Sequence, residues 1–489
     1  MNVKRLLGTV PFFVAVVFVW PSLARSFEIP YIFSDPLRIT PAVVEKGAIL
    51  PGDTAPIPRS FQKKITQPLA LVDAVDLALS NNPKLTESWA DIKVQTGAVG
   101  QAYAAYLPVL NGSINWTADN VHYSDSQIPS TDINHYTSQA SATWRIFDFG
   151  GRSANRHSAE NLLAAALATY DVTLQEALAG VIQAYFDATT ASASLNAKIK
   201  GEEISQSLLL SAQGREAEGA TSQLDTLRAA TALAKAALDK NRALGSFQKS
   251  LAVLRYYVGI PGSVELLVPS ELDENQVGER QSKELSLWLD EAQKNHPSIT
   301  AAKKQLEAAQ EQMISTKSAG LPTIDLSGNY YQNTRPGASV SPGATETTLT
   351  VALSIPLFDG FASTYKFRGA QAQVEKQAAA LSGVEQQVAM GIIKAHADTT
   401  SALRNLEASA KLLALAQSAL ATSQRRYENG AGDIAEVLST QAALADAWNE
   451  RVRALAEWHS ARLLLLANAG KMGRFAVAGS AANVPVLPK

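Results

Sequence analysis

The side chains that most often carry chemistry show no catalytic arrangement in this chain of 489 residues. Cysteine is absent, which excludes disulfides, thiolate nucleophiles, iron–sulfur clusters and a lipid anchor on an N-terminal cysteine. The six histidines have no short metal-ligand spacing, and the sequence contains no nucleophile elbow and no phosphate-binding loop. We therefore expect no enzyme activity, no metal site and no cofactor.

The N-terminus has the pattern of a secretory signal peptide. Lys4 and Arg5 precede an apolar run, and small residues at 22–24 would allow cleavage after Ala24. The run is shorter than the ~20 residues that a spanning helix needs. We expect residues 1–24 to direct export, without lipidation, and a membrane location would then require a β-barrel. The formal net charge of −2 favours no nucleic-acid partner.

Short motifs occur twice along the chain, in the same order. Asn82-Pro83 and Leu107-Pro108 return as His296-Pro297 and Leu321-Pro322, at an offset of 214 residues. Phe147-Asp148 and Gly219 return as Phe358-Asp359 and Gly430, at an offset of 211 residues. This pattern predicts an internal repeat, with a first copy at residues 69–283 and a second at residues 284–470.

Each copy is predicted to contain a helix, two strands and a long helical hairpin, which makes the fold class α+β. The first helices run from about Leu69 to Tyr106 and from Ser286 to Ala319, and Pro108 and Pro322 follow them. Strands are expected within 109–148 and 323–357. The hairpins are expected at 151–258 and 360–468, where apolar residues have coiled-coil spacing. Residues 25–68 are rich in proline and are expected to form an extended strap, and residues 471–489 are a tail without periodicity.

The predicted strands alternate strictly between apolar and polar residues. Apolar side chains at Leu349, Val351, Leu353 and Ile355 alternate with Thr350, Ala352 and Ser354. A soluble sheet over a core has the same pattern. Export, and helices without a spare apolar face, favour instead a barrel whose apolar residues face lipid. Because known barrels begin at about eight strands, four strands per chain predict a homotrimer with a 12-stranded barrel.

Several of these motifs resemble the TolC family of outer-membrane efflux and secretion channels. They are Asn81-Asn82-Pro83, Leu107-Pro108, residues 146–152 (IFDFGGR), residues 355–360 (IPLFDG) and residues 426–430 (RYENG). The resemblance extends from about Leu69 to Gly470. It implies a trimeric β-barrel in the outer membrane, continued by a long α-helical coiled-coil barrel in the periplasm. It also implies a periplasmic adaptor protein and an inner-membrane pump, of RND or ABC type, as partners.

The resemblance further implies an exit duct for a tripartite efflux pump or a type I secretion system, gated at the periplasmic hairpin tips. The implied residues are Gly219 and Gly430 at the tips, Asp225, Asp433 and Glu436 as pore-gate acids, and Arg426 and Tyr427 as a gate latch. Gly432 and Ser439 depart from a latch arginine and a second gate acid found in a well-known member. A solvated helix face is the other interpretation of these charges.

A periplasmic coiled-coil adaptor or scaffold protein is the alternative function. Such a protein would contain helical hairpins and soluble β-domains, without two amphipathic strand pairs in a repeat. The cargo, whether drug, metal or protein, has no signature in the sequence.

Overall fold

The computed structural model describes residues 35–41, 68–121, 131–262, 264, 266–269, 284–333 and 343–473. The predicted signal peptide lies outside these residues, as do residues 25–34 and 42–67 of the predicted strap and residues 474–489 of the tail. Within the described part of the chain, no helix is long and apolar enough to cross a membrane.

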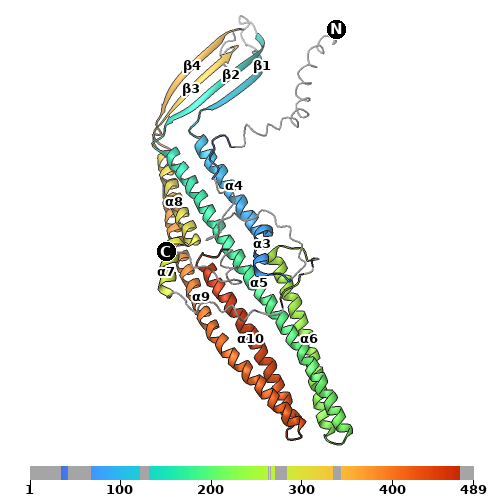
Figure 1. Cartoon of the computed structure of the whole chain (residues 1–489). Coiled ribbons are helices and arrows are strands. Elements are labelled where there is room, and N and C mark those ends of the chain that lie inside the picture. The colour runs from blue at the N-terminus through green and yellow to red at the C-terminus, as the bar shows by residue number, and fades with distance from the viewer. Residues whose placement is uncertain are drawn as a thin grey trace, which may run out of the picture.

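Two long helical hairpins give the molecule its elongated shape (Figure 1). In the first, α5 (Gly151–Ala217) is followed by α6 (Gln223–Val258), and in the second, α9 (Ala362–Glu428) is followed by α10 (Ile434–Asn468). Helices α5 and α9 have 67 residues each, which corresponds to roughly 100 Å at 1.5 Å per residue. The hairpin tips lie at one end of the molecule and a β-sheet lies at the other.

The first helix of each repeat is broken, so the prediction of single helices there was wrong. Four helices replace the two: α3 (Leu71–Asn81), α4 (Pro83–Ala104), α7 (Leu285–Asn295) and α8 (Pro297–Ser318). Proline disfavours the α conformation in the residue before it, and both Asn82 and His296 have extended backbones. Proline is tolerated as the first residue of the next helix, where no N–H partner is needed.

A glycine at the end of each hairpin lies against the corresponding break. Gly259 and Gly470 have φ values of +73° and +71°, which glycine adopts without strain. A Cβ at Gly259 would come 2.9 Å from the carbonyl oxygen of Asn81, and one at Gly470 would come 2.6 Å from Cδ of Pro297. Each hairpin therefore returns to the first helices of its own repeat through a contact that excludes a side chain.

The main core lies where α3, α4, α5 and α6 meet. Val75 and Ile92 pack there with Leu174, Val181 and Leu254, all fully or almost fully buried. The described part of the strap joins this core, since Ile39 packs against it and lies beside Gly100 of α4.

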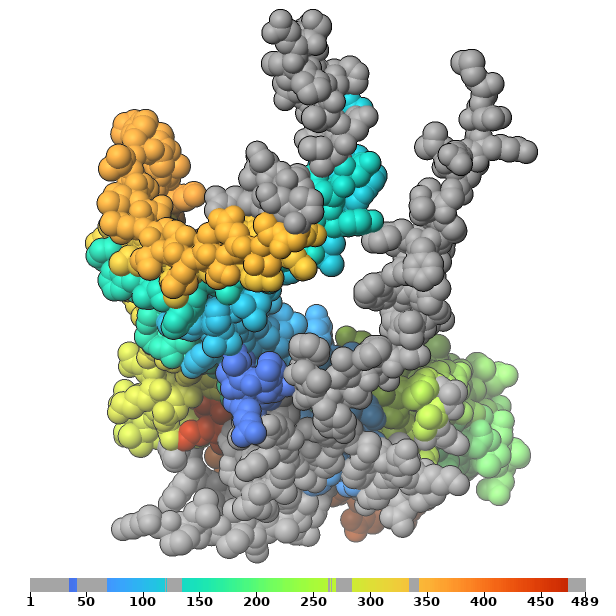
Figure 2. Space-filling view, turned by 90° about the horizontal axis from the view of Figure 1, so that it is seen from above, coloured from blue at the N-terminus to red at the C-terminus, as the bar shows by residue number. Residues whose placement is uncertain are grey.

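The sheet has the order β1-β2-β3-β4, and every neighbouring pair is antiparallel. The strands are β1 (Val109–Val121), β2 (Thr131–Phe147), β3 (Thr323–Gln332) and β4 (Thr345–Ser354). The pairing of β2 with β3 joins the two repeats. Seen from above, orange atoms of the second repeat lie against cyan and teal atoms of the first (Figure 2).

The register places most of the large apolar residues of the four strands on one face. One row across the sheet contains Leu110, Ala142, Gly328 and Leu349, and the next row on the opposite face contains Asn111, Ser141, Asn329 and Thr348. The apolar side chains are uncovered in the single chain: Leu349 is 77% exposed and Val351 is 70% exposed. Strand β4 ends at Ser354, so Ile355, which precedes Pro356, lies just outside the strand.

Candidate gate at the helical tips

The two hairpin tips have the same backbone construction. Gly219 and Gly430 have φ values of +73° and +72°. Ala220 N–H donates to the Arg215 carbonyl, and Ala431 N–H donates to the Arg426 carbonyl, both at 2.8 Å. Glycine in the left-handed conformation ends a helix in this way by satisfying its last carbonyls. The repeat therefore extends to the hydrogen bonds of the tips.

Asp225 lies in the first turn of α6 and is held by its own tip. Its carboxylate accepts hydrogen bonds from Thr221 Oγ1 at 2.8 Å and from Ser222 Oγ at 3.0 Å, and it pairs with Arg228 at 3.3 Å. The hydroxyl hydrogen bonds, followed by the charge of Arg228, hold the pKa of Asp225 below its usual range. Asp225 is therefore an ionised, fixed negative charge near the tip.

The two predicted acids of the second tip make different contacts. Asp433 caps α10 by accepting a hydrogen bond from Ala435 N–H at 3.1 Å. Glu436 instead pairs with Arg426 at 3.1 Å, and both side chains are largely exposed. The structure thus brings one predicted gate acid and one predicted latch residue together. Asp433 instead bonds to the first turn of its own helix.

Tyr427, the other predicted latch residue, is buried against the first hairpin. It packs with Ile434 and Val437 of α10, and burial raises the pKa of its phenol. Arg215 at the end of α5 donates to the Tyr427 carbonyl at 2.8 Å, and its guanidinium lies 4.7 Å from the centre of the Tyr427 ring. This contact joins the two tips within one chain through a charged hydrogen bond and a cation–π interaction.

Arg215 was missed in the sequence analysis. The available signal was the repeat itself, since Arg215 lies 211 residues before Arg426. The same position therefore holds an arginine in both halves, but only the first arginine reaches the other hairpin.

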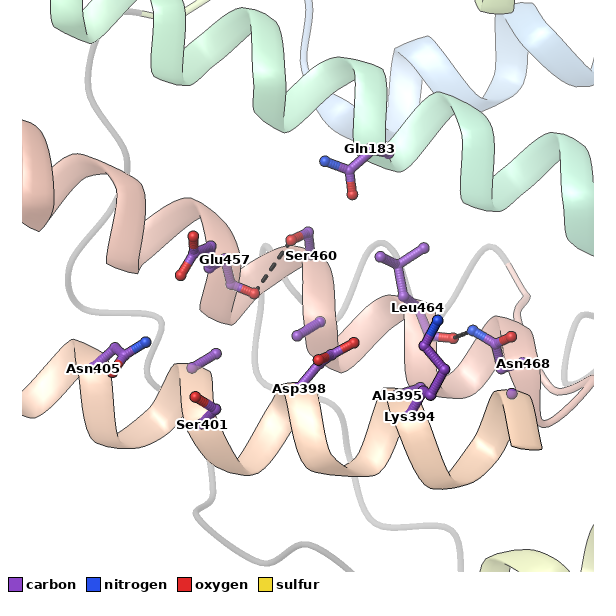
Figure 3. Close-up of a pocket in the computed structure, with 13 residues that line it drawn as sticks. Gln183, Lys394, Ala395, Asp398, Ser401, Asn405, Glu457, Ser460, Leu464 and Asn468 are labelled. Atoms are coloured by element: carbon purple, nitrogen blue, oxygen red, sulfur yellow. Dashed lines mark hydrogen bonds between the residues drawn. The ribbon is translucent and has the colours of Figure 1, made fainter. Parts of the chain in front are cut away.

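Farther from the tips, a groove of about 550 Å³ is lined by residues of α9 and α10 in the second hairpin and by Gln183 of α5 in the first. Figure 3 shows Gln183 of α5 facing α10 across this groove, and Lys394 and Asp398 of α9 on the opposite wall. Nearer the tips, α5 and α10 are joined by neutral hydrogen bonds from Gln441 to Ser205 and from Ser194 to Asn449. Among the described residues, no group of three histidine, aspartate or glutamate side chains could hold a metal ion.

Comparison with known proteins identifies the class to which this architecture belongs. The model of the outer membrane efflux protein family matches residues 74–260 and 288–471, one segment in each repeat. The chain belongs to this family, whose members are transport channels of the outer membrane, and the resemblance seen in the sequence is confirmed.

Individual relatives agree with this assignment. Protein CyaE of Bordetella pertussis is 33% identical over 463 residues, which cover 94% of this chain and 96% of that protein. Outer membrane efflux protein BepC of Brucella suis is 24% identical over 384 residues, 78% of each chain. The crystal structure of the outer membrane protein VceC from Vibrio cholerae has the same fold, with a TM-score of 0.70 at 20% identity, covering 82% of this chain and 96% of that one.

The Arg215–Tyr427 contact is expected to show energetic coupling in a double-mutant cycle. Arg215→Ala and Tyr427→Leu each remove the cation–π interaction, so their combined effect on stability should fall short of the sum by about 0.5–1 kcal/mol. Thermal unfolding of the four proteins in detergent measures this difference. Arg425→Ala is the matched control, because Arg425 bonds to its own helix at Ala421; its effect should add to that of Tyr427→Leu. Additivity of the Arg215 and Tyr427 variants would contradict the predicted coupling.

Proposed function

We propose that three copies of this chain form the outer-membrane exit duct of a tripartite efflux pump or a type I secretion system. The observation that carries this proposal is the uncovered apolar face of the sheet, which includes Leu110, Ile114 and Val351. An apolar face of this size in water marks an interaction surface. In the proposed barrel, lipid contacts this apolar face and a water-filled lumen contacts the polar face.

Closure of the sheet requires other copies of the chain. Strands β1 and β4 are the two edges of the four-stranded sheet, and they run in opposite directions. Strand β4 of one chain is therefore oriented to pair antiparallel with β1 of the next. Three chains would make a closed barrel of twelve strands, which removes every open edge. The long hairpins would extend this tube into the periplasm.

In this proposal the duct is passive and its partners supply energy and cargo. A periplasmic adaptor protein would join the helical end to an inner-membrane pump of RND or ABC type. Three-fold symmetry would arrange Asp225, Asp433 and Glu436 of the three chains as rings of carboxylates around the pore. Such rings favour the passage of cations. The Arg215–Tyr427 contact would hold the two tips of each chain together in the closed state.

The gate acids are tested by conductance. Glu436→Gln combined with Asp225→Asn is expected to reduce cation selectivity and block by multivalent cations, because it removes two carboxylates from each chain. Recordings of single channels in planar bilayers measure both properties. Glu375→Gln is the matched control, since Glu375 is exposed within α9 and far along the chain from the tips.

These recordings test the proposed duct and the proposed gate separately. If wild-type protein forms no conducting channel, the proposed duct is wrong. If the wild type conducts and the double variant retains its selectivity and cation block, the duct stands and the constriction lies elsewhere.

The lipid-facing side of β4 is tested by charge insertion at adjacent positions. Val351→Arg is expected to destabilise the assembled protein in lipid by about 2–4 kcal/mol if Val351 lies near the bilayer midplane. Thr350→Arg should have a much smaller effect, because Thr350 lies on the opposite, polar face. Chemical unfolding from lipid vesicles measures both. Equal costs at the two positions would show that the apolar face does not meet lipid.

A further inference from the structure

The break between α7 and α8 is capped by a histidine whose two ring nitrogens are both engaged. Nδ1 of His296 accepts a hydrogen bond from Ser298 N–H at 3.1 Å, and Nε2 lies 3.1 Å from the carbonyl oxygen of Asn468 at the end of α10. An accepting nitrogen carries no proton, whereas a nitrogen that bonds to a carbonyl oxygen carries one. Only the neutral imidazole with its proton on Nε2 satisfies both contacts.

We call the helix break and the hairpin end that packs against it a joint. The first repeat has an equivalent joint, in which the capping side chain is not titratable. Asn82 occupies the equivalent position, also directly before a proline, and its Oδ1 accepts a hydrogen bond from Lys84 N–H at 2.9 Å. The amide of asparagine accepts this bond at any physiological pH, whereas imidazole changes its charge between about pH 5 and 8. The two halves of the chain therefore share a cap but differ in its response to protons.

The second joint connects three parts of the structure. It sets the break between α7 and α8, and His296 ties that break to the last turn of α10. Gly470, two residues after the end of α10, lies too close to Pro297 to accept a side chain. Lys471, the next residue, pairs with Glu291 of α7. Loss of the His296 cap would thus act where the second hairpin returns to its own repeat.

We propose that His296 is a proton-sensitive cap that loosens the joint of α7, α8 and the end of α10 when the surroundings become acidic, while the matching joint at Asn82 stays closed. A proton on Nδ1 removes the acceptor of the Ser298 N–H, and the first turn of α8 loses its side-chain cap. This inference concerns the single chain and does not depend on the proposed duct.

The elements that meet at this joint carry charged residues, which are Glu291 and Lys294 on α7, Lys303 on α8, Lys394 and Asp398 on α9, and Lys471 after α10. Glu291 is paired with Lys471, so it is not a free counter-ion for an imidazolium. Helix α9 belongs to this set because Gly391 and Asn468 approach closely.

The expected pH dependence has a definite sign. Burial lowers the pKa of His296, and the hydrogen bond to Asn468 opposes this more weakly. The unfolded chain, with a histidine pKa of about 6.5, therefore takes up a proton before the folded chain does. The stability contributed by the neutral cap is fully present above about pH 6.5 and is lost as the pH falls toward the lower folded pKa.

Hydrogen exchange followed by mass spectrometry on the full-length protein in detergent tests the proposal. Rates are corrected for the intrinsic effect of pH and compared at about pH 7.5 and about pH 5. The amides of residues 298–300 should lose protection about fivefold at the lower pH, the order of effect of one lost helix cap. The amides of residues 84–86, at the start of α4, should keep theirs and serve as a control within the same molecule.

Substitutions test whether the acid-induced loss of protection comes from the His296 cap or from another titrating group. His296→Asn installs the residue that the first repeat uses, and it should abolish the acid-induced loss at residues 298–300 while the protein stays folded. His396→Asn, on α9, removes a histidine that caps no helix and should leave the loss unchanged. An equal loss in wild type and His296→Asn, or no loss in wild type, would overturn the proposal.

Discussion

Four strands carry most of their large apolar side chains on one face, which no helix of the described residues covers. The alternation of residues fixes this arrangement, because a register shift of one residue would turn the apolar set to the other face. Two unpaired edges accompany it. Together they leave the single chain incomplete: the face needs an apolar environment and the edges need partner strands. The proposed trimer in a lipid bilayer meets both needs, and the long hairpins then extend the tube that the strands begin.

The two repeats share the same helices and strands, but different residues at equivalent positions give each repeat its own side-chain contacts. Asp148 and Asp359 both cap the first turn of a long helix, accepting from Arg152 N–H at 2.9 Å and from Ser363 N–H at 2.8 Å. Only Arg152 also binds carbonyl groups of β2, those of Arg145 and Ile146. Of the two N–H donors to these caps, Arg152 in the first repeat is therefore the one whose side chain also ties its helix to the sheet. Equivalent positions also differ at the tips, where Arg215 contacts the other hairpin and Arg426 does not. At the helix breaks, the cap is Asn82 in the first repeat and the titratable His296 in the second.

Much of the fold follows from patterns that a sequence displays directly. Alternation at Leu349, Val351 and Leu353 predicted a strand with one apolar face, which β4 has, and the recurring motifs predicted the family, which comparison confirms. Contacts between distant elements were not predictable in this way. The pairing of Glu436 with Arg426 depends on how the tip folds back on itself, and that of Arg215 with Tyr427 depends on how two hairpins lie together. Hydrophobic periodicity in the sequence indicates which face of a helix or strand is apolar, but it does not indicate which other element packs against that face. The helix breaks at Pro83 and Pro297 had a local signal, which the longer apolar pattern obscured.

Disulfide cross-linking of the sheet edges tests the central claim most directly, because the chain has no cysteine of its own. One cysteine is placed on β1 and one on β4 of every chain, at edge positions scanned along both strands, and the protein is oxidised in native outer membranes. If β4 of each chain pairs with β1 of the next in a closed ring, matched positions will yield covalent trimers and no larger species. A chain that remains monomeric at every pair of positions, or that forms an open ladder beyond three, would contradict the closed trimer.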